Sequence, residues 1–405
     1  MSFRDIDILP GETSRAIIKE LDKFTTTVMR PAGIDLDVCS APADVYAETS
    51  PLWNVFNAFR ALDLHLVDIP EPLGGFGRLD TVTGVLTAER LGFADPGLAI
   101  GLMTVSTPFR LASRIGTPAM ADLARRFCED RKGVMIGCGA LFSRPLTLPD
   151  ADSSSATKPG AALSAREDGD GFLLSGQLAG VVNAAIGSHG TFDVDIVTRD
   201  QHRTRGLTIL SLDDPGVARE TRAAVSSQRS MPRGVLRFNN VRIPAENVIT
   251  EKDAVTDNFR SVLLIEQNRF LAAVYAGLAR AALEEALAYA KKRVQGGVPI
   301  VEHRNIRLQL FNMFKSVEAA RACVLRLAVW HEHHGPVHNT WPHVVAARCQ
   351  AIDAACQVTS EAIQIFGGYG LAREFPLEKF FRDARRGAVD GGINEDLAIE
   401  AMQMV

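Results

Sequence analysis

The chain has 405 residues, which is enough for two or three packed domains rather than one. It contains 46% hydrophobic and 23% charged residues and carries a net charge of −4, so it offers no basic surface for nucleic acid. No apolar run reaches the roughly 18 residues of a membrane-spanning helix, and the polar start with Asp5 and Asp7 is atypical of a secretory signal. Six cysteines without CxxC spacing indicate reduced thiols in a cytoplasmic protein.

Residues 1–133 are predicted to form a helical domain. Apolar side chains recur three and four positions apart in segments such as 81–93 and 118–130, as on the buried face of a helix. Prolines and glycines predict a loop at 69–80, between two of these helices. The glycine cluster of this loop, LGGFG, follows no strand and lacks a third glycine, so it is not a dinucleotide-binding fingerprint.

Residues 134–248 are predicted to form a β domain, because the period of the apolar residues changes from helical to alternating. Short β-branched segments bounded by Gly, Asp or Pro are spaced as in a small antiparallel barrel or sandwich. A polar segment rich in Ser, Pro and Ala, 144–164, is expected to be a loop. The expected strands are GFLLSGQLAGVVNA, FDVDIVTRD, GLTILSLDD and GVLRFNNVRIP.

Residues 249–405 are predicted to form a third, helical domain. Segments 257–293, 304–330 and 341–366 are long, rich in alanine or apolar residues, and separated by short loops. Long helices joined by short loops favour an antiparallel four-helix bundle. The expected fold is therefore α+β, with a helical domain, a central antiparallel β-barrel domain and a C-terminal four-helix bundle.

The histidine-rich segment 330–343 is expected not to bind a metal. It lies in a predicted turn between two long helices, where polar residues are common, and it lacks a third ligand at defined spacing from a helical i, i+4 pair. Its histidines are His331, His333, His334, His338 and His343.

The last long helix ends in a glycine-rich stretch. A glycine such as Gly367 often ends a helix because only glycine adopts a positive φ at little cost, but capping does not account for the whole stretch. The segment 363–385, IQIFGGYGLAREFPLEKFFRDAR, closely resembles the C-terminal motif of the acyl-CoA dehydrogenase family of flavoproteins. HLVDIPEPLGGFGR, VLRFNNVRIPAENVI and the segment 279–321 resemble other parts of the family in the same order, so the resemblance covers nearly the whole chain.

This resemblance implies an FAD-dependent oxidoreductase that desaturates an acyl-CoA or acyl-carrier thioester between Cα and Cβ. A carboxylate removes the α-proton while a hydride leaves Cβ for the flavin, which supplies the acceptor that this unactivated carbon needs. The family also implies an oligomer with the FAD site shared between subunits, and electron-transfer flavoprotein or a similar protein as electron acceptor.

The resemblance assigns one half of the FAD site to the helical bundle. This half holds the ADP portion of a neighbouring subunit's FAD, where an arginine fork suits phosphate oxygens and glycines admit the pyrophosphate. Gly296 stands where the family has a phenylalanine. The matching residues are Arg293, Gln295, Gln364, Gly367 and Gly368.

The half-site that would hold the flavin ring departs more strongly from the family pattern. Ser143 retains a hydroxyl, but Arg144 stands where the family has an acid. Gly180 replaces the aromatic residue that packs on the ring, and Val182 replaces the next hydroxyl, while Asn183 is retained. A glycine cannot stack on a ring, and a valine cannot hydrogen-bond to one.

Neither position at which the family carries its catalytic glutamate has a carboxylate in this chain. The usual position falls on Gly391, and the alternative, on the first long C-terminal helix, falls on Asn268. Asp390, adjacent to the first position, is the candidate that a one-residue shift of the loop would aim inward. Weaker candidates are Glu266, Glu395 and Asp396.

Four functions fit these observations. The chain is an autonomous flavin dehydrogenase, or the base-lacking subunit of a heteromeric dehydrogenase, which explains why the losses gather in one half-site. Alternatively it performs other flavin chemistry on the same fold, such as monooxygenation, or it is a non-catalytic scaffold subunit.

Overall fold

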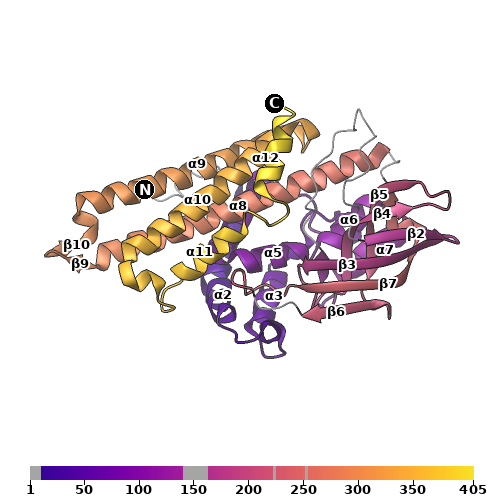
Figure 1. Ribbon diagram of the computed structural model, residues 1–405, viewed down its shortest axis with the longest axis horizontal. Helices are drawn as coiled ribbons and strands as arrows, with labels where there is room; N and C mark the ends of the chain where they lie inside the picture. The colour runs from indigo at the N-terminus through magenta and orange to yellow at the C-terminus, as the bar shows by residue number, and fades with distance from the viewer. Residues whose placement is uncertain (1–10, 140–162, 222–224, 251–253) are drawn as a thin grey trace.

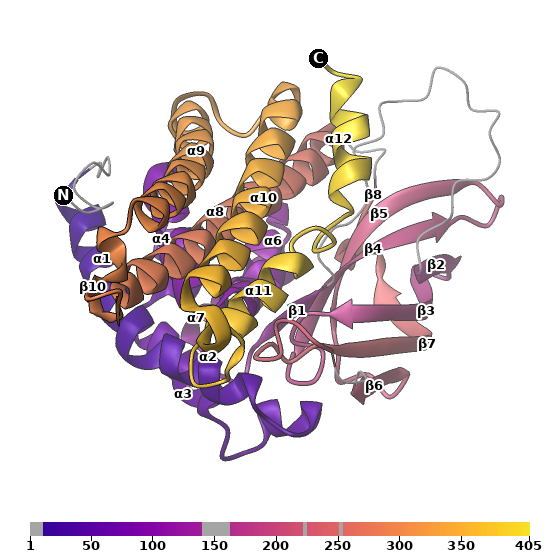
Figure 2. The ribbon, with the colours of Figure 1, turned by 60° about the vertical axis from the view of Figure 1, so that its left-hand side comes forward.

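The computed structural model describes residues 11–139, 163–221, 225–250 and 254–405. Helices come first along the chain, strands follow, and helices return. Long helices fill one side of the molecule and a β-sheet lies on the other, with the shorter N-terminal helices beneath and between them (Figures 1 and 2).

The N-terminal helices are short and several begin at side-chain caps. Asp80 accepts a hydrogen bond from the backbone N–H of Thr83 at 2.8 Å, and Asp95 accepts one from Leu98 at 2.8 Å, which satisfies amides that have no partner within the helix. The helices are α1 (Glu12–Phe24), α2 (Arg30–Asp37), α3 (Pro51–Ala61), α4 (Thr81–Ala94), α5 (Pro96–Thr104), α6 (Thr107–Ile115) and α7 (Pro118–Glu129), with a π-helical turn at Thr25–Met29.

The strands form one eight-stranded sheet of order β6-β7-β3-β2-β4-β5-β8, with β1 paired to β4. Most neighbours are antiparallel, but β1 and β2 both run parallel to β4. The strands are β1 (Gly137–Gly139), β2 (Leu163–Asp168), β3 (Gly171–Val181), β4 (His189–Val197), β5 (Arg203–Ser211), β6 (Val217–Thr221), β7 (Gly234–Pro244) and β8 (Val248–Thr250).

The C-terminal helices are the longest in the molecule. They are α8 (Ala254–Lys292), α9 (Arg304–His334), α10 (Trp341–Phe366), α11 (Leu377–Arg386) and α12 (Asn394–Met402), and a short hairpin, β9 (Val294–Gln295) and β10 (Val298–Pro299), joins α8 to α9. Helix α10 packs along both α8 and α9, so the three helices that the sequence predicted form one bundle.

Helix α4 binds the N-terminal helices to this bundle by crossing α8 at two glycines. A Cβ on Gly92 would lie 2.1 Å from the carbonyl oxygen of Val274, and one on Gly277 would lie 1.9 Å from that of Glu89, so only glycine permits this approach. Buried Glu89 pairs there with Arg280 and Arg321, which joins α4 to α8 and α9 by charge as well as by packing.

The expected fold class is confirmed: helical, β and helical parts follow one another, and the three long C-terminal helices begin and end within a few residues of the predicted positions. The parallel pairing at β4 is the main feature that the alternating pattern did not predict. None of the helices in the described ranges is long and apolar enough to span a membrane.

Candidate functional site

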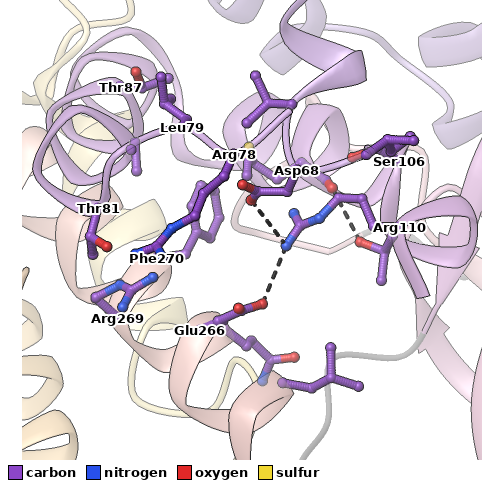
Figure 3. A pocket seen from close by; sticks show the side chains of 18 of the residues that line it. Asp68, Arg78, Leu79, Thr81, Thr87, Ser106, Arg110, Glu266, Arg269 and Phe270 are labelled. Carbon is purple, nitrogen blue, oxygen red and sulfur yellow. Dashed lines mark hydrogen bonds and ion pairs between the residues drawn. The ribbon is translucent and has the colours of Figure 1, made fainter. Parts of the chain in front are cut away.

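A cavity of about 600 Å³ lies between the N-terminal helices and α8, and we call it the interdomain cavity. Apolar side chains such as Ile100, Met103 and Phe270 form much of its wall, and Gly139 of β1 and Thr191 of β4 also line it. Figure 3 shows that charged side chains project into the same space from the N-terminal loop, from α6 and from α8.

Four of these charged groups form one ion-pair network. Arg110 Nη2 lies 3.6 Å from a carboxylate oxygen of Asp68 and 3.3 Å from one of Glu266, and Arg114 pairs with the other oxygen of Glu266 at 3.0 Å. Arg110 and Arg114 are one helical turn apart on α6, so they meet the same carboxylate. Burial alone would raise the pKa of Glu266, but the guanidinium groups of Arg114 and Arg110 outweigh it and hold the pKa below its ordinary value.

Gly391 lies beside this cavity, in the turn between α11 and α12. A Cβ on Gly391 would lie 2.7 Å from Nε2 of Gln267, which lines the cavity, and 3.3 Å from a methyl carbon of Leu271. The φ of Gly391 is +69°, a conformation that other residues adopt at a cost. The backbone of this turn therefore has a conformation that favours glycine, and any larger side chain at position 391 would require the side chain of Gln267 to move.

Asp390 is buried in a polar network and does not line the interdomain cavity. One oxygen accepts hydrogen bonds from Arg233 at 3.0 Å and Arg386 at 2.8 Å, and the other accepts them from Gln228 at 2.8 Å and Tyr275 at 2.9 Å. Burial would raise the pKa of Asp390, but Arg233 and Arg386 hold it below its ordinary value. Asp390, the weak candidate that a one-residue shift of the loop would aim inward, is bonded in this network instead, and its carboxylate joins the C-terminal turn to the loop before β7.

Asn268, which the family resemblance aligns with the alternative glutamate, is fully buried and also lies outside the cavity wall. Its amide nitrogen donates to the carbonyl oxygen of Leu264 at 2.8 Å, and its oxygen accepts from Arg348 of α10. Arg348 is itself fully buried and also donates to the carbonyl oxygens of Gly387 and Asp390 and of both glycines that follow. One guanidinium thus holds the whole C-terminal turn.

The three weaker candidates for the base lie in different parts of the structure. Glu266 lines the interdomain cavity, whereas Glu395 and Asp396 are exposed in the first turn of α12, where acidic residues favour a helix N-terminus.

All five residues predicted to hold a nucleotide line a second, more open cavity of about 870 Å³. This bundle-end cavity is formed by the end of α8, the β9–β10 hairpin, the start of α9 and the end of α10. A Cβ on Gly367 or Gly368 would meet nothing within 4 Å, so the backbone is accessible there, and Gly367 has a φ of +61°. The five residues are Arg293, Gln295, Gln364, Gly367 and Gly368.

The residues predicted to meet a flavin ring have structural roles in the β domain. Gly180, with a φ of +72°, sits at an irregularity in the pairing of β3 with β7, and Val182 is fully buried and exchanges backbone hydrogen bonds with Gly139. The amide of Asn183 donates to the carbonyl oxygens of Gly101 and Gly137 at 2.9 and 3.1 Å, which ties β3 to α5 and β1. Ser143 and Arg144 lie outside the described residues.

The sequence did not single out three residues that the structure brings to this region. Arg348 appeared only as one arginine in an alanine-rich helix, although a charge on an apolar helix face was a signal. Arg110 and Arg269 were not predicted to line a pocket, because no local sequence pattern indicates that α6 packs near α8. The spacing of Arg110 and Arg114, four apart, was the available signal of a shared partner.

Known proteins resemble this chain over most of its length. The model of the acyl-CoA dehydrogenase N-terminal domain matches residues 11–130, and that of the C-terminal domain matches 263–403. The short-chain specific acyl-CoA dehydrogenase of Megasphaera elsdenii is 30% identical over 324 residues, covering 78% of this chain and 79% of that protein. A probable acyl-CoA dehydrogenase of Mycobacterium tuberculosis, FadE25, is 29% identical over 345 residues, covering 84% and 83% of the two chains.

Solved structures agree in fold. The butyryl-CoA dehydrogenase of Megasphaera elsdenii superimposes with a TM-score of 0.82 at 24% identity, covering 98% of this chain and 99% of that one. The flavoprotein nitroalkane oxidase superimposes with a TM-score of 0.84 at 16% identity. The matching models at both ends, together with the 30% identical relative, show that this chain belongs to the acyl-CoA dehydrogenase family of oxidoreductases.

Proposed function

We propose that this chain is the base-lacking subunit of a heteromeric, FAD-dependent enzyme that desaturates an acyl-CoA or acyl-carrier thioester between Cα and Cβ. The observation that carries the proposal is a contrast between two places in the molecule. Five nucleotide-binding candidates line one open cavity, while the position that the family resemblance assigns to the base is a glycine, Gly391, with a positive φ and no carboxylate.

The bundle-end cavity fits the ADP portion of an FAD bound mainly by a neighbouring subunit. Arg293 is exposed there and none of the described carboxylates pairs with it, so its planar fork is available to two phosphate oxygens. The absence of a Cβ at Gly367 and Gly368 leaves room for a ligand to approach the backbone closely. These features support FAD as the cofactor and an oligomer as the working form.

The residues of this chain that correspond to the family's flavin-ring site support the role of a base-lacking subunit. Gly180 lies within strand β3 and Val182 is fully buried directly after it. Neither side chain can stack on a flavin ring or form a hydrogen bond with it. FAD would supply the hydride acceptor for the β-hydrogen, but abstraction of the α-proton needs a carboxylate. We therefore assign both the ring and the base to the partner, a relative that retains the glutamate. Electron-transfer flavoprotein or a similar protein is the expected acceptor.

A second candidate is an autonomous dehydrogenase in which Glu266 is the base. Its favouring observation is that Glu266, Asp68 and Asp80 are the carboxylates that line the interdomain cavity in the described part of the chain. Both oxygens of Glu266 are bonded to arginines, however, and its lowered pKa makes it a poor proton acceptor. We therefore rank this candidate below the heteromeric subunit.

The test compares the chain purified alone with the chain co-purified with a glutamate-bearing family member. The proposal expects a colourless protein alone and a yellow complex that oxidises an acyl thioester. An isolated chain with stoichiometric FAD and full turnover would overturn it. If the activity of the isolated chain disappears in Glu266→Gln, the autonomous candidate is correct. FAD binding with oxygen-dependent hydroxylation would indicate monooxygenase chemistry. A complex whose activity does not require this chain would indicate a scaffold subunit.

A further inference from the structure

The bundle-end cavity is held in shape by hydrogen bonds within this chain. The backbone N–H of Arg293 donates to the carbonyl oxygen of Tyr289 at 2.8 Å, and the carbonyl oxygen of Arg293 accepts from the N–H of Ile300 at 2.8 Å. Nε2 of His303 donates to the carbonyl oxygen of Gln295 at 2.9 Å. These bonds fix the end of α8 and the β9–β10 hairpin, both of which line the cavity. Because the wall is already ordered, a ligand loses little affinity to the ordering of protein groups.

Several residues that line this cavity suit a phosphate group. Arg293 is exposed and none of the described carboxylates pairs with it, so its guanidinium fork is available to two oxygens of one anion. Gly367 and Gly368 leave room for a close approach to the backbone. Gly296, which stands where the family resemblance places a phenylalanine, lines the cavity without a side chain that would cover it.

Aromatic rings line the same cavity. Tyr289 and Phe366 stack with their centroids 3.9 Å apart and their planes 17° apart. Tyr369 also lines the cavity and is 51% exposed, so its ring is available to a base. Arg293 follows Tyr289 by one helical turn, so the guanidinium and the aromatic pair face the same space. A planar base and a phosphate on one ligand would find partners here together.

Side-chain amides complete the set of available polar groups. In the described part of the chain, the amides of Gln295, Gln364 and Asn305 line the cavity and form no hydrogen bond with another residue. An amide both donates and accepts, as the ring nitrogens and the amino group of adenine require. The cavity volume of about 870 Å³ lies within the range of small-molecule sites. These groups therefore match an adenine nucleotide, with or without a flavin attached.

We propose that the bundle-end cavity of this chain binds free ADP, and that free ADP competes there with the FAD held by the partner and so opposes assembly of the complex. The inference rests on the proposed function and adds regulation of its cofactor site. Competition follows because the ADP portion of FAD and free ADP present the same base and phosphates to the same residues, and two ligands of one site exclude each other.

The first experiment measures binding to the purified chain by calorimetry, with ADP, FAD and FMN as probes. ADP and FAD should bind within about 3-fold of each other, with a dissociation constant on the order of 10–100 μM, because the flavin ring adds no contact on this chain. Binding of this strength is lost during purification, which agrees with a colourless isolated chain. FMN, which has a phosphate and the flavin ring but no adenosine, should bind at least about 10-fold more weakly.

Variants then separate the phosphate contact from the base contact. Arg293→Ala should weaken ADP about 10- to 100-fold, whereas Arg304→Ala, an exposed arginine outside the cavity, should not. Tyr369→Leu should weaken ADP about 10-fold and leave inorganic pyrophosphate unchanged. Phe311→Leu is its matched control, because Phe311 is 59% exposed but lies outside the cavity, and it should change neither ligand.

The second experiment measures assembly with the FAD-loaded, glutamate-bearing partner by light scattering. ADP at about ten times its own dissociation constant should weaken assembly about 10-fold. FMN at the same concentration should have little effect. Assembly of the Arg293→Ala chain should be insensitive to this concentration of ADP, because the variant no longer binds it.

An isolated chain that binds no ADP, within a complex that still retains FAD, would overturn the inference and leave the proposed function standing. FMN affinity equal to that of ADP, or ADP affinity unchanged in Arg293→Ala, would also overturn it, since the ligand would then be bound by other groups. ADP binding without any effect on assembly would overturn the regulatory role. An isolated chain that retains FAD through purification and turns over an acyl thioester would show instead that the proposed function fails, and the inference fails with it.

Discussion

Arg348 of α10 donates a hydrogen bond to the carboxamide oxygen of Asn268 on α8 at a distance of 2.5 Å. The same guanidinium donates to the carbonyl oxygen of Gly391 at 3.2 Å. Both positions at which the family resemblance expects a glutamate are therefore attached to one buried cation, and neither supplies it with a carboxylate. Burial lowers the pKa of Arg348, because its hydrogen-bond acceptors are neutral oxygens and the nearby ionisable groups, Asp390 among them, offset the loss of water only in part.

Arg348 should be one of the most important residues for stability. Replacing it with methionine removes every donor at once and leaves several buried oxygens without a partner. Each such oxygen costs about 1–3 kcal/mol, so Arg348→Met should lower the free energy of unfolding by at least about 3 kcal/mol. Urea denaturation measures this change, with the exposed Arg326→Met as control. Equal denaturation midpoints for the two variants would contradict the role assigned to Arg348.

Gly391→Glu should not restore a dehydrogenase. The positive φ of Gly391 costs another residue about 1–2 kcal/mol, and the new Cβ would lie 2.7 Å from Nε2 of Gln267. Gly297→Glu is the matched control, because Gly297 also has a positive φ, +86°, but has open space around it. The 391 variant should therefore be the less stable of the two by thermal denaturation, and Gln267→Ala should recover part of the difference. Turnover by the isolated Gly391→Glu chain would show that its ring site is intact.

Arg293→Ala should reduce the FAD content of the co-purified complex without affecting the fold. Arg293 is exposed in the bundle-end cavity, and losing a charge-assisted contact to phosphate costs about 1.5–3 kcal/mol, or roughly 10- to 100-fold in affinity. Absorbance at the flavin bands after dialysis measures the loss. Arg304→Ala, an exposed arginine at the start of α9 that does not line the cavity, should leave FAD bound. Identical FAD retention in both variants would remove Arg293 from the site.

Stability should fall as the pH is lowered from about 6.5 to about 4. Burial lowers the pKa of His331 to about 4, and burial together with Arg60 does the same for His65, while both titrate near 6.5 when the chain is unfolded. In this window the unfolded state binds more protons than the folded state, so acid favours unfolding. His331→Gln cannot titrate and should make the dependence of unfolding free energy on pH shallower. Parallel pH profiles of variant and wild type would contradict a buried neutral imidazole.

The surface of α9 should be an oligomer interface. Leu308 and Phe311, one turn apart, are 61% and 59% exposed, an unusual exposure for large apolar side chains on adjacent turns. Phe311→Asp should therefore shift the protein to a smaller species in size-exclusion chromatography with light scattering. Lys315→Glu, an exposed change of charge one turn further along, should not. An unchanged mass for Phe311→Asp would mean that this face is not covered by another subunit.

Much of the architecture follows from local patterns in the chain. Runs of apolar residues at helical spacing predicted α8, α9 and α10 because long helices impose a strong period. The family resemblance, rather than a local pattern, predicted that Arg293 and Gln364 would share a site, and both line the bundle-end cavity. The parallel pairing of β1 and β2 with β4 could not be predicted, since alternation indicates a strand but not its neighbour.

The family, the order of the three parts and the absence of a carboxylate at positions 268 and 391 follow from residue identity and short-range spacing, so they can be read along the chain. Which charged groups face a cavity depends instead on the packing of the helices. Asp390 and Glu266 are both acids near the predicted site, yet one is enclosed by Arg233 and Arg386 and the other lines the interdomain cavity. That difference arises from how helices distant in sequence pack together, and it sets the burial and charge neighbours on which each pKa depends.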